Sequence, residues 1–265
     1  MKRPADTIAM LETIRRVRRG LSRSARTADA TDGTTAQPDA AAPPETVEAA
    51  FGPGFYGKVP ARGDFVAVGL PRSFLNPWDG WLQGALTESR IRIGTAWDRL
   101  FAASPVWRFA LSPGLCGPRA VAGVMVPSAD RVGRLYPFML AAALPAGVDL
   151  TTVPFGCAPW YGRAEEAALA ACQAGAEIDR IAADLGNLGL PNPGFSIRNP
   201  VHRAHLIEMV GTLPEIPSIW WTRGAHWVTP SLLACRGLPS NERFAAFIDN
   251  GWDRWGWEDL DAPGR

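Results

Sequence analysis

Apolar and polar residues alternate along this chain in runs typical of short strands and amphipathic helices. Strand-length apolar runs are expected at 55–59, 65–68, 106–111, 121–126, 136–144, 219–221 and 231–235. After the second run, apolar residues recur at helical spacing from Phe74 to Leu86, with Ser73 as the expected N-cap and Pro77 in the first turn. Further helices are predicted over 97–103, about 162–188, and 240–249, where Ser240 or Asn241 is the expected cap.

The order of these elements predicts an α+β fold. Consecutive strands with short connections favour antiparallel pairing, and amphipathic helices bury their apolar faces against a sheet. We therefore expect a mainly antiparallel sheet flanked by helices, with a longin- or roadblock-like core as the expected topology.

The first 50 residues differ in composition from the rest. Residues 1–26 carry eight basic residues, while 27–50 are rich in Ala, Thr, Asp and Pro and poor in bulky apolar residues. The basic stretch either forms an amphipathic helix for an anionic surface or acidic partner, or is a frayed extension. We expect a basic, disordered extension and linker over 1–50, a folded domain over 51–250 and a C-terminal tail over 251–265.

Composition narrows the function class. A net charge of +1 gives no bulk reason for nucleic-acid or membrane-surface binding. The four cysteines, at 116, 157, 172 and 235, lack CxxC or zinc spacing and are expected to be reduced thiols. No apolar run approaches the roughly 20 residues that span a bilayer. These features favour a cytoplasmic protein without a membrane span.

Candidate catalytic chemistry is sparse. His202, His205 and Glu208 would share one face of a helix and could bind a metal, which makes a small metal-dependent hydrolase the alternative reading. Against it, Arg203 adds positive charge and no HExxH signature is present, so surface or capping histidines are favoured. We expect no enzyme activity, no cofactor and no metal.

Two polar segments between predicted strands carry more charge than a turn requires. The first holds Lys58, Arg62 and Asp64, and the second, 128–134, holds Asp130, Arg131 and Arg134. Such residues either fix the turns through local hydrogen bonds or recognise a partner, because loops above a rigid sheet are suited to binding. We expect both segments near one end of the sheet.

Several blocks of sequence together resemble the TagF (ImpM) family of accessory proteins of bacterial type VI secretion. They are GKVPARGDF at 57–65, LPRSF at 70–74, PWDGWL at 77–82, PSADRVGRLYP at 127–137 and PSIWW at 217–221. The resemblance implies a non-enzymatic, cytoplasmic, post-translational repressor of type VI secretion that binds the forkhead-associated (Fha) scaffold protein. A structural subunit of the secretion apparatus is the other alternative. We expect the partner-binding residues among Lys58, Arg62, Asp64, Asp130, Arg131 and Arg134.

Overall fold

Nine strands form a single sheet in the computed structural model, which describes residues 17–20, 50–194, 204, 207–208 and 217–259. The strand order is β3-β2-β6-β5-β4-β7-β8-β1-β9. The strands are β1 (Val17–Gly20), β2 (Gly54–Gly57), β3 (Val66–Val68), β4 (Trp107–Leu111), β5 (Val121–Val126), β6 (Phe138–Ala143), β7 (Pro217–Thr222), β8 (Ser231–Arg236) and β9 (Glu258–Asp259).

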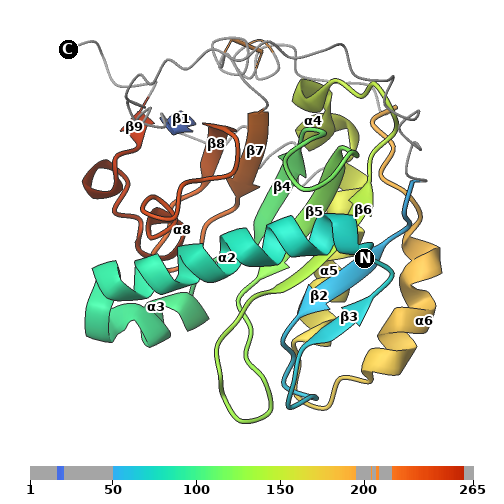
Figure 1. The fold of residues 1–265 in the computed structure, drawn as a ribbon, viewed down its shortest axis with the longest axis horizontal. Coiled ribbons are helices and arrows are strands. Elements are labelled where there is room, and N and C mark those ends of the chain that lie inside the picture. Colours follow the sequence, from blue (N-terminus) through green and yellow to red (C-terminus); the bar gives the residue numbers. More distant parts are fainter. Residues whose placement is uncertain (1–16, 21–49, 195–203, 205–206, 209–216, 260–265) are drawn as a thin grey trace, which may run out of the picture.

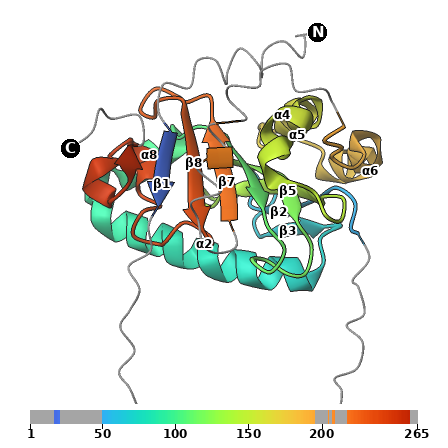
Figure 2. The same ribbon diagram turned by 90° about the horizontal axis from the view of Figure 1, so that it is seen from above.

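Every neighbouring pair from β3 to β8 in this order is antiparallel, so the prediction of a mainly antiparallel sheet flanked by helices is confirmed. The helices lie on both faces (Figures 1 and 2). They are α2 (Arg72–Ile93), α3 (Trp97–Ala102), α4 (Val153–Gly156), α5 (Ala158–Ala171), α6 (Ile178–Leu188) and α8 (Ala246–Asp249), with single 3₁₀ turns at Gly94–Ala96, Leu150–Thr152 and Asp253–Trp255. The longin- or roadblock-like topology stays a prediction.

Successive side chains along each strand point to opposite faces of the sheet, so the core consists of two layers, one on each face. In β4, Phe109 packs with α2, α3 and α8, whereas Ala110 packs on the opposite face with α4, α5 and α6. Tryptophans supply much of the α2 layer, where the Trp78 ring lies 4.8 Å from Phe109 and 6.1 Å from Trp220 between centroids. Among the eleven tryptophans, Trp227 is exposed, at 41%.

Helix boundaries differ from the prediction at α2. The helix begins at Arg72, and Pro71, not Ser73, occupies the N-cap position with an extended backbone and no side-chain cap bond. The Pro71 carbonyl accepts hydrogen bonds from the amides of Phe74 and Leu75, which starts the helix two residues before the expected point. Pro77 therefore lies in the second turn rather than the first.

Two other predicted helices are also corrected. The single helix expected over 162–188 is two helices, α5 and α6, separated by a turn in which Gly175 adopts φ +80°. α5 ends at Ala171 with Cys172 as its C-cap, and Gly175 allows the turn that follows, because a positive φ is unfavourable for residues with a Cβ. The helix expected over 240–249 is shortened to α8, and hydrogen-bonded turns starting at the Ser240 carbonyl precede it.

Residues near both ends of the chain contribute to the sheet. The boundaries predicted from composition had placed these residues outside the folded domain. Val17–Gly20 forms β1 inside the segment expected to be disordered; the rest of 1–49 lies outside the described residues. In the predicted tail, Trp252 and Trp257 are buried in the α2 layer and Glu258–Asp259 forms β9. The folded unit therefore extends at least to Asp259.

Candidate functional site

The two polar segments meet at one end of the sheet. They connect β2 to β3 and β5 to β6, and β2 pairs with β6, with Gly57 opposite Phe138. The Arg131 amide donates to the Arg62 carbonyl at 2.8 Å, and the Arg134 guanidinium Nη2 donates to the Gly63 carbonyl at 2.6 Å. The prediction that these loops lie together is confirmed by this geometry.

A buried ion pair joins the loops beneath the surface. Lys58 Nζ lies 3.0 Å from Asp130 Oδ2, and their side chains are 10% and 0% exposed. Asp130 Oδ1 accepts the amides of Val132 and Arg134, while Oδ2 also accepts Arg134 Nε at 2.6 Å. Burial alone raises the pKa of the Asp130 carboxyl, but these hydrogen bonds outweigh it and hold the pKa well below its usual range.

A second polar junction ties the loops to helix α2. The hydroxyls of Tyr56 and Tyr136 both donate to Asp79 Oδ1, at 2.8 and 2.6 Å. Burial and this bond to a carboxylate raise the pKa of both phenols, so they stay protonated donors. Phe65 stacks on Tyr56 at 5.4 Å and meets Tyr136 edge-on at 4.8 Å between centroids. The two loops are therefore held both by the Lys58–Asp130 pair and by the hydrogen bonds to Asp79 of α2.

The outer side of this junction forms an exposed surface, here named the joined-loop surface. Lys58 and Asp130 are buried, so they hold the loops in place and are not available to a partner. The other four predicted residues are exposed, and two apolar residues that the prediction did not include, Phe65 at 40% and Val132 at 69%, lie among them. The surface consists of Arg62, Asp64, Phe65, Arg131, Val132 and Arg134.

Charge on the joined-loop surface is mainly positive. Arg131 and Arg134 flank Gly63: the Arg134 guanidinium bonds its carbonyl, and Arg131 Nη2 lies 3.4 Å from the place a Cβ would occupy. Arg62 is paired with Asp179 of α6 at 3.0 Å, with both side chains exposed. Arginine and aromatic residues are enriched at protein-recognition surfaces.

An open groove of about 420 Å³ continues from the joined-loop surface along α2. Leu135 and Tyr136, which directly follow the second loop, form one wall. Helix α2 supplies the other wall, where Ile91 is 71% exposed and Arg90 stacks over the Trp97 ring at 4.1 Å. The groove is lined by Gln83, Leu86, Thr87, Arg90, Ile91, Trp97, Leu135 and Tyr136.

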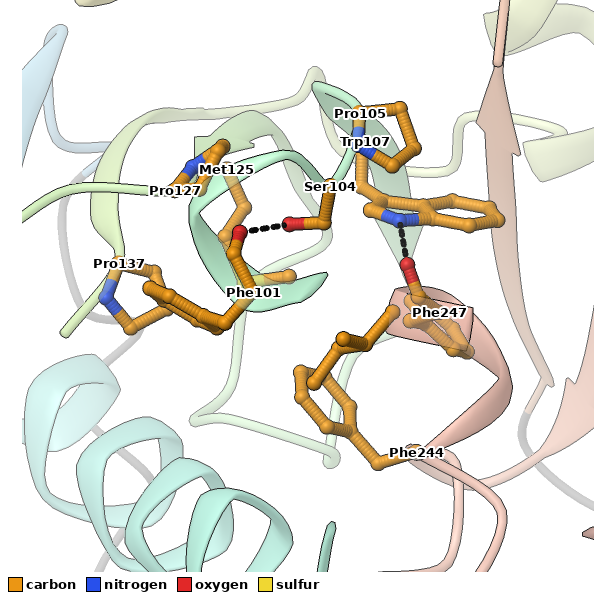
Figure 3. Close-up of a pocket in the computed structure, with 10 residues that line it drawn as sticks. Phe101, Ser104, Pro105, Trp107, Met125, Pro127, Pro137, Phe244 and Phe247 are labelled. Atoms are coloured by element: carbon orange, nitrogen blue, oxygen red, sulfur yellow. Dashed lines mark hydrogen bonds between the residues drawn. The ribbon is translucent and has the colours of Figure 1, made fainter. Parts of the chain in front are cut away.

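A second hollow, between α3, β5 and α8, is apolar and very small (Figure 3). Its volume of about 10 Å³ has room for little more than one water. The polar groups drawn there are already bonded, since the Ser104 hydroxyl donates to the Phe101 carbonyl and Trp107 Nε1 donates to the Phe247 carbonyl. It is a packing gap of the core and not a ligand site.

Within the described residues, no group of three or more His, Cys, Asp or Glu side chains is arranged to hold a metal ion. His202 and His205 lie outside the described residues, and Glu208 is exposed. Burial raises the pKa of the Cys116, Cys157 and Cys235 thiols to about 12. These thiols are therefore poor nucleophiles near neutral pH.

No helix among the described residues has both the length and the apolar character to cross a bilayer.

Comparison with known proteins identifies the family. A family described as TagF N-terminal domain, Type VI secretion system-associated, matches residues 54–188, about half of the chain. The crystal structure of PA0076 from Pseudomonas aeruginosa PAO1 is 34% identical, with a TM-score of 0.66 over 75% of this chain and 94% of that one. No curated protein matches the chain. Both loops of the joined-loop surface fall inside the matched region, and the chain belongs to the TagF family of type VI secretion-associated proteins.

Proposed function

We propose that this protein is a non-enzymatic, cytoplasmic, post-translational repressor of type VI secretion that acts by binding the forkhead-associated scaffold protein through the joined-loop surface. The observation that carries the proposal is that some charged residues of the two loops are buried and join the loops, whereas others are exposed. Lys58 and Asp130 are buried and hold the loops together, and Arg134 joins Asp130 to the Gly63 carbonyl at the surface, while the side chains of Arg62 and Arg131 are exposed.

Rigidity favours binding at this surface. Loops ordered before contact lose little conformational entropy on association, so more of the interaction energy remains as affinity. The Asp130 hydrogen bonds and the Asp79 junction supply this order in the free protein. A flexible charged loop would have to be immobilised by its partner.

The chemistry of the joined-loop surface indicates the kind of contact it makes. Arginine and aromatic residues are enriched where interfaces gain most of their affinity, and rim charges mainly accelerate association. Phe65 and Val132 add exposed apolar area to this surface. The matching patch on the scaffold protein is therefore expected to be acidic and to contain apolar residues.

Co-purification from cytosol of the source bacterium tests the proposal against its two alternatives. The full chain should capture the scaffold protein, and the Arg131→Glu variant should capture much less of it. Arg72→Glu is the matched control, because Arg72 is an exposed arginine at the start of α2, outside the joined-loop surface.

Other outcomes would assign other functions. Capture of assembled sheath without the scaffold protein would indicate a structural subunit. Stoichiometric zinc after dialysis against a chelator, together with hydrolytic activity, would indicate the metal-dependent hydrolase. Restored repression of secretion by Arg131→Glu in a deletion strain, at the level of Arg72→Glu, would contradict the role of the joined-loop surface.

A further inference from the structure

The open hollow between helix α2 and the residues after the second loop, here named the α2 groove, has a volume of about 420 Å³. Helix α2 crosses one face of the sheet (Figures 1 and 2), and its exposed residues Gln83, Thr87 and Ile91 recur at intervals of four along one side. Leu135 and Tyr136 form the facing wall. Binding clefts in proteins measure about 300–1,000 Å³, so the groove has room for bulky side chains of a partner.

The most buried lining residues form an apolar floor. Leu86, Trp97 and Tyr136 are 8%, 2% and 6% exposed. Trp97 Nε1 donates to the Ser89 hydroxyl at 2.9 Å, and the Tyr136 hydroxyl donates to Asp79 at 2.6 Å. Because both donors are already used, the floor offers mainly carbon surface. The groove is therefore suited to an apolar side chain.

Two residues at the rim add an apolar contact and a positive charge. Ile91 is 71% exposed, more than any other large apolar residue of the described chain. Arg90 stacks over the Trp97 ring at 4.1 Å, and its Nη2 lies 3.3 Å from Asp98, with both side chains of this ion pair more than half exposed. A guanidinium has five N–H donors, so Arg90 can bond a partner carboxylate besides Asp98. The rim therefore favours an apolar residue with an acidic neighbour.

The α2 groove is continuous with the joined-loop surface. Leu135 directly follows Arg134 in the chain, and Tyr136, which lines the groove, meets Phe65 edge-on at 4.8 Å between ring centroids. A stable protein interface involves about 20–30 residues on each side, whereas the joined-loop surface consists of six. A protein that binds there tightly therefore covers neighbouring surface as well, and the groove is next to it.

We propose that the α2 groove holds a segment of the same partner protein that binds the joined-loop surface, and that this segment carries an apolar side chain next to acidic residues. The inference rests on the proposed function and adds the place and chemistry of a second contact. The apolar side chain packs on Leu86 and Trp97, and an acidic neighbour bonds Arg90. Positive charge from Arg90 in the groove and Arg131 on the joined-loop surface is complementary to one acidic partner.

Isothermal titration of the purified scaffold protein tests the proposal with four forms of the full chain: wild type, Ile91→Asp, Leu169→Asp and Arg131→Glu. We expect Ile91→Asp to weaken the affinity roughly tenfold or more, because it replaces an apolar contact by a charge that repels acidic residues. Leu169→Asp is the matched control and should bind like wild type, since Leu169 is an exposed apolar residue of α5, on the opposite face of the sheet.

The four forms separate this proposal from the proposed function. Weakened binding by Arg131→Glu, with equal binding by Ile91→Asp and Leu169→Asp, would overturn the groove as a partner site and leave the proposed function standing. Weakened binding by Ile91→Asp alone would support the groove and contradict the joined-loop surface. No binding by the wild type would contradict both. A concentration-dependent dimer that is lost in Ile91→Asp would also overturn the proposal, because the groove would then belong to a second copy.

A photocrosslink identifies the bound segment directly. Benzoylphenylalanine in place of Thr87, which is exposed and lines the groove, should crosslink to the scaffold protein. Mass spectrometry should then find the crosslink on a segment with an apolar residue beside Asp or Glu, and the same group in place of Leu169 should give no crosslink. Crosslinks to a basic segment, or equal yields from the two positions, would overturn the proposal.

Discussion

Lys58 and Asp130 lie 72 positions apart in the sequence and form an ion pair, Nζ to Oδ2 at 3.0 Å, beneath the surface of the protein. The pair fixes the β2–β3 loop against the β5–β6 loop. The charged residues of this region therefore fall into two groups, one buried and one exposed. The buried pair sets the loop geometry, and Arg62, Arg131 and Arg134 around it are exposed.

Replacement of Lys58 by Met should loosen the loops without unfolding the protein. Asp130 would keep Arg134 and two backbone amides, so its carboxylate would remain partly compensated. We expect a fall in melting temperature of roughly 5 °C. Asp64→Ala is the control, because Asp64 is exposed and its loss should change the melting temperature little. Equal melting temperatures for the two variants would show that the buried pair does not hold the loops.

Removal of the Glu165 carboxylate should be more damaging. Arg108 of β4 is 2% exposed, and Glu165 of α5 accepts its Nε at 3.0 Å and also its Nη2. Burial lowers the pKa of Arg108, and the Glu165 charge opposes that shift. Glu165→Ala leaves the guanidinium buried without this partner and should reduce the free energy of unfolding by about 3 kcal/mol.

Glu166→Ala is the matched control in denaturant unfolding, since Glu166 is the adjacent and exposed carboxylate on the same helix. A change of less than about 0.5 kcal/mol is typical for such a surface site. A similar loss for Glu165→Ala and Glu166→Ala would contradict the structural importance of the Arg108 pair.

Acid should weaken the loop junction through Asp130. The folded-state pKa of this carboxyl lies below its ordinary value, so its contribution to stability is present above about pH 4 and is lost as pH falls further. The difference in melting temperature between wild type and Asp130→Asn should therefore be largest at pH 5–8 and shrink at pH 3. A difference that stays constant from pH 7 to pH 3 would contradict this role for the carboxylate.

The thiols should be protected while the protein is folded. Burial raises the pKa of Cys116, Cys157 and Cys235 to about 12, and the thiolate is the reactive form. With Ellman's reagent at pH 8, these three should react only on unfolding. Cys172 is partly exposed and should be the first to react in native protein, which mass spectrometry can assign. Rapid native labelling of Cys235 would contradict its position in β8.

Long apolar runs could be located from the sequence, and short elements that depend on distant partners could not. β5 is a run of six buried residues with no competing interpretation. β1 carries two arginines and no apolar alternation, and its strand conformation depends on pairing with β8 and β9, which the far end of the chain supplies. The break between α5 and α6 depends on Gly175, which a continuous run of Ala and Glu obscured.

The candidate site was predicted only in part, because the burial of its charged residues also depends on segments that are distant in the sequence. The excess of charge in the two loops indicated their importance, but charge alone cannot show which member is buried. Lys58 and Asp130 are paired only because β2 and β6 are neighbours in the sheet. Phe65 and Val132 were missed because one belonged to a predicted strand and the other stood between charged residues.

The most direct test of the account is isothermal titration of the purified scaffold protein with three forms of the full chain: wild type, Arg131→Glu and Arg72→Glu. We expect Arg131→Glu to weaken the affinity roughly tenfold or more, with an unchanged melting temperature, because an exposed charge of the joined-loop surface is reversed. Arg72→Glu should bind like wild type. Equal affinities for all three forms would contradict the joined-loop surface as the site of partner recognition.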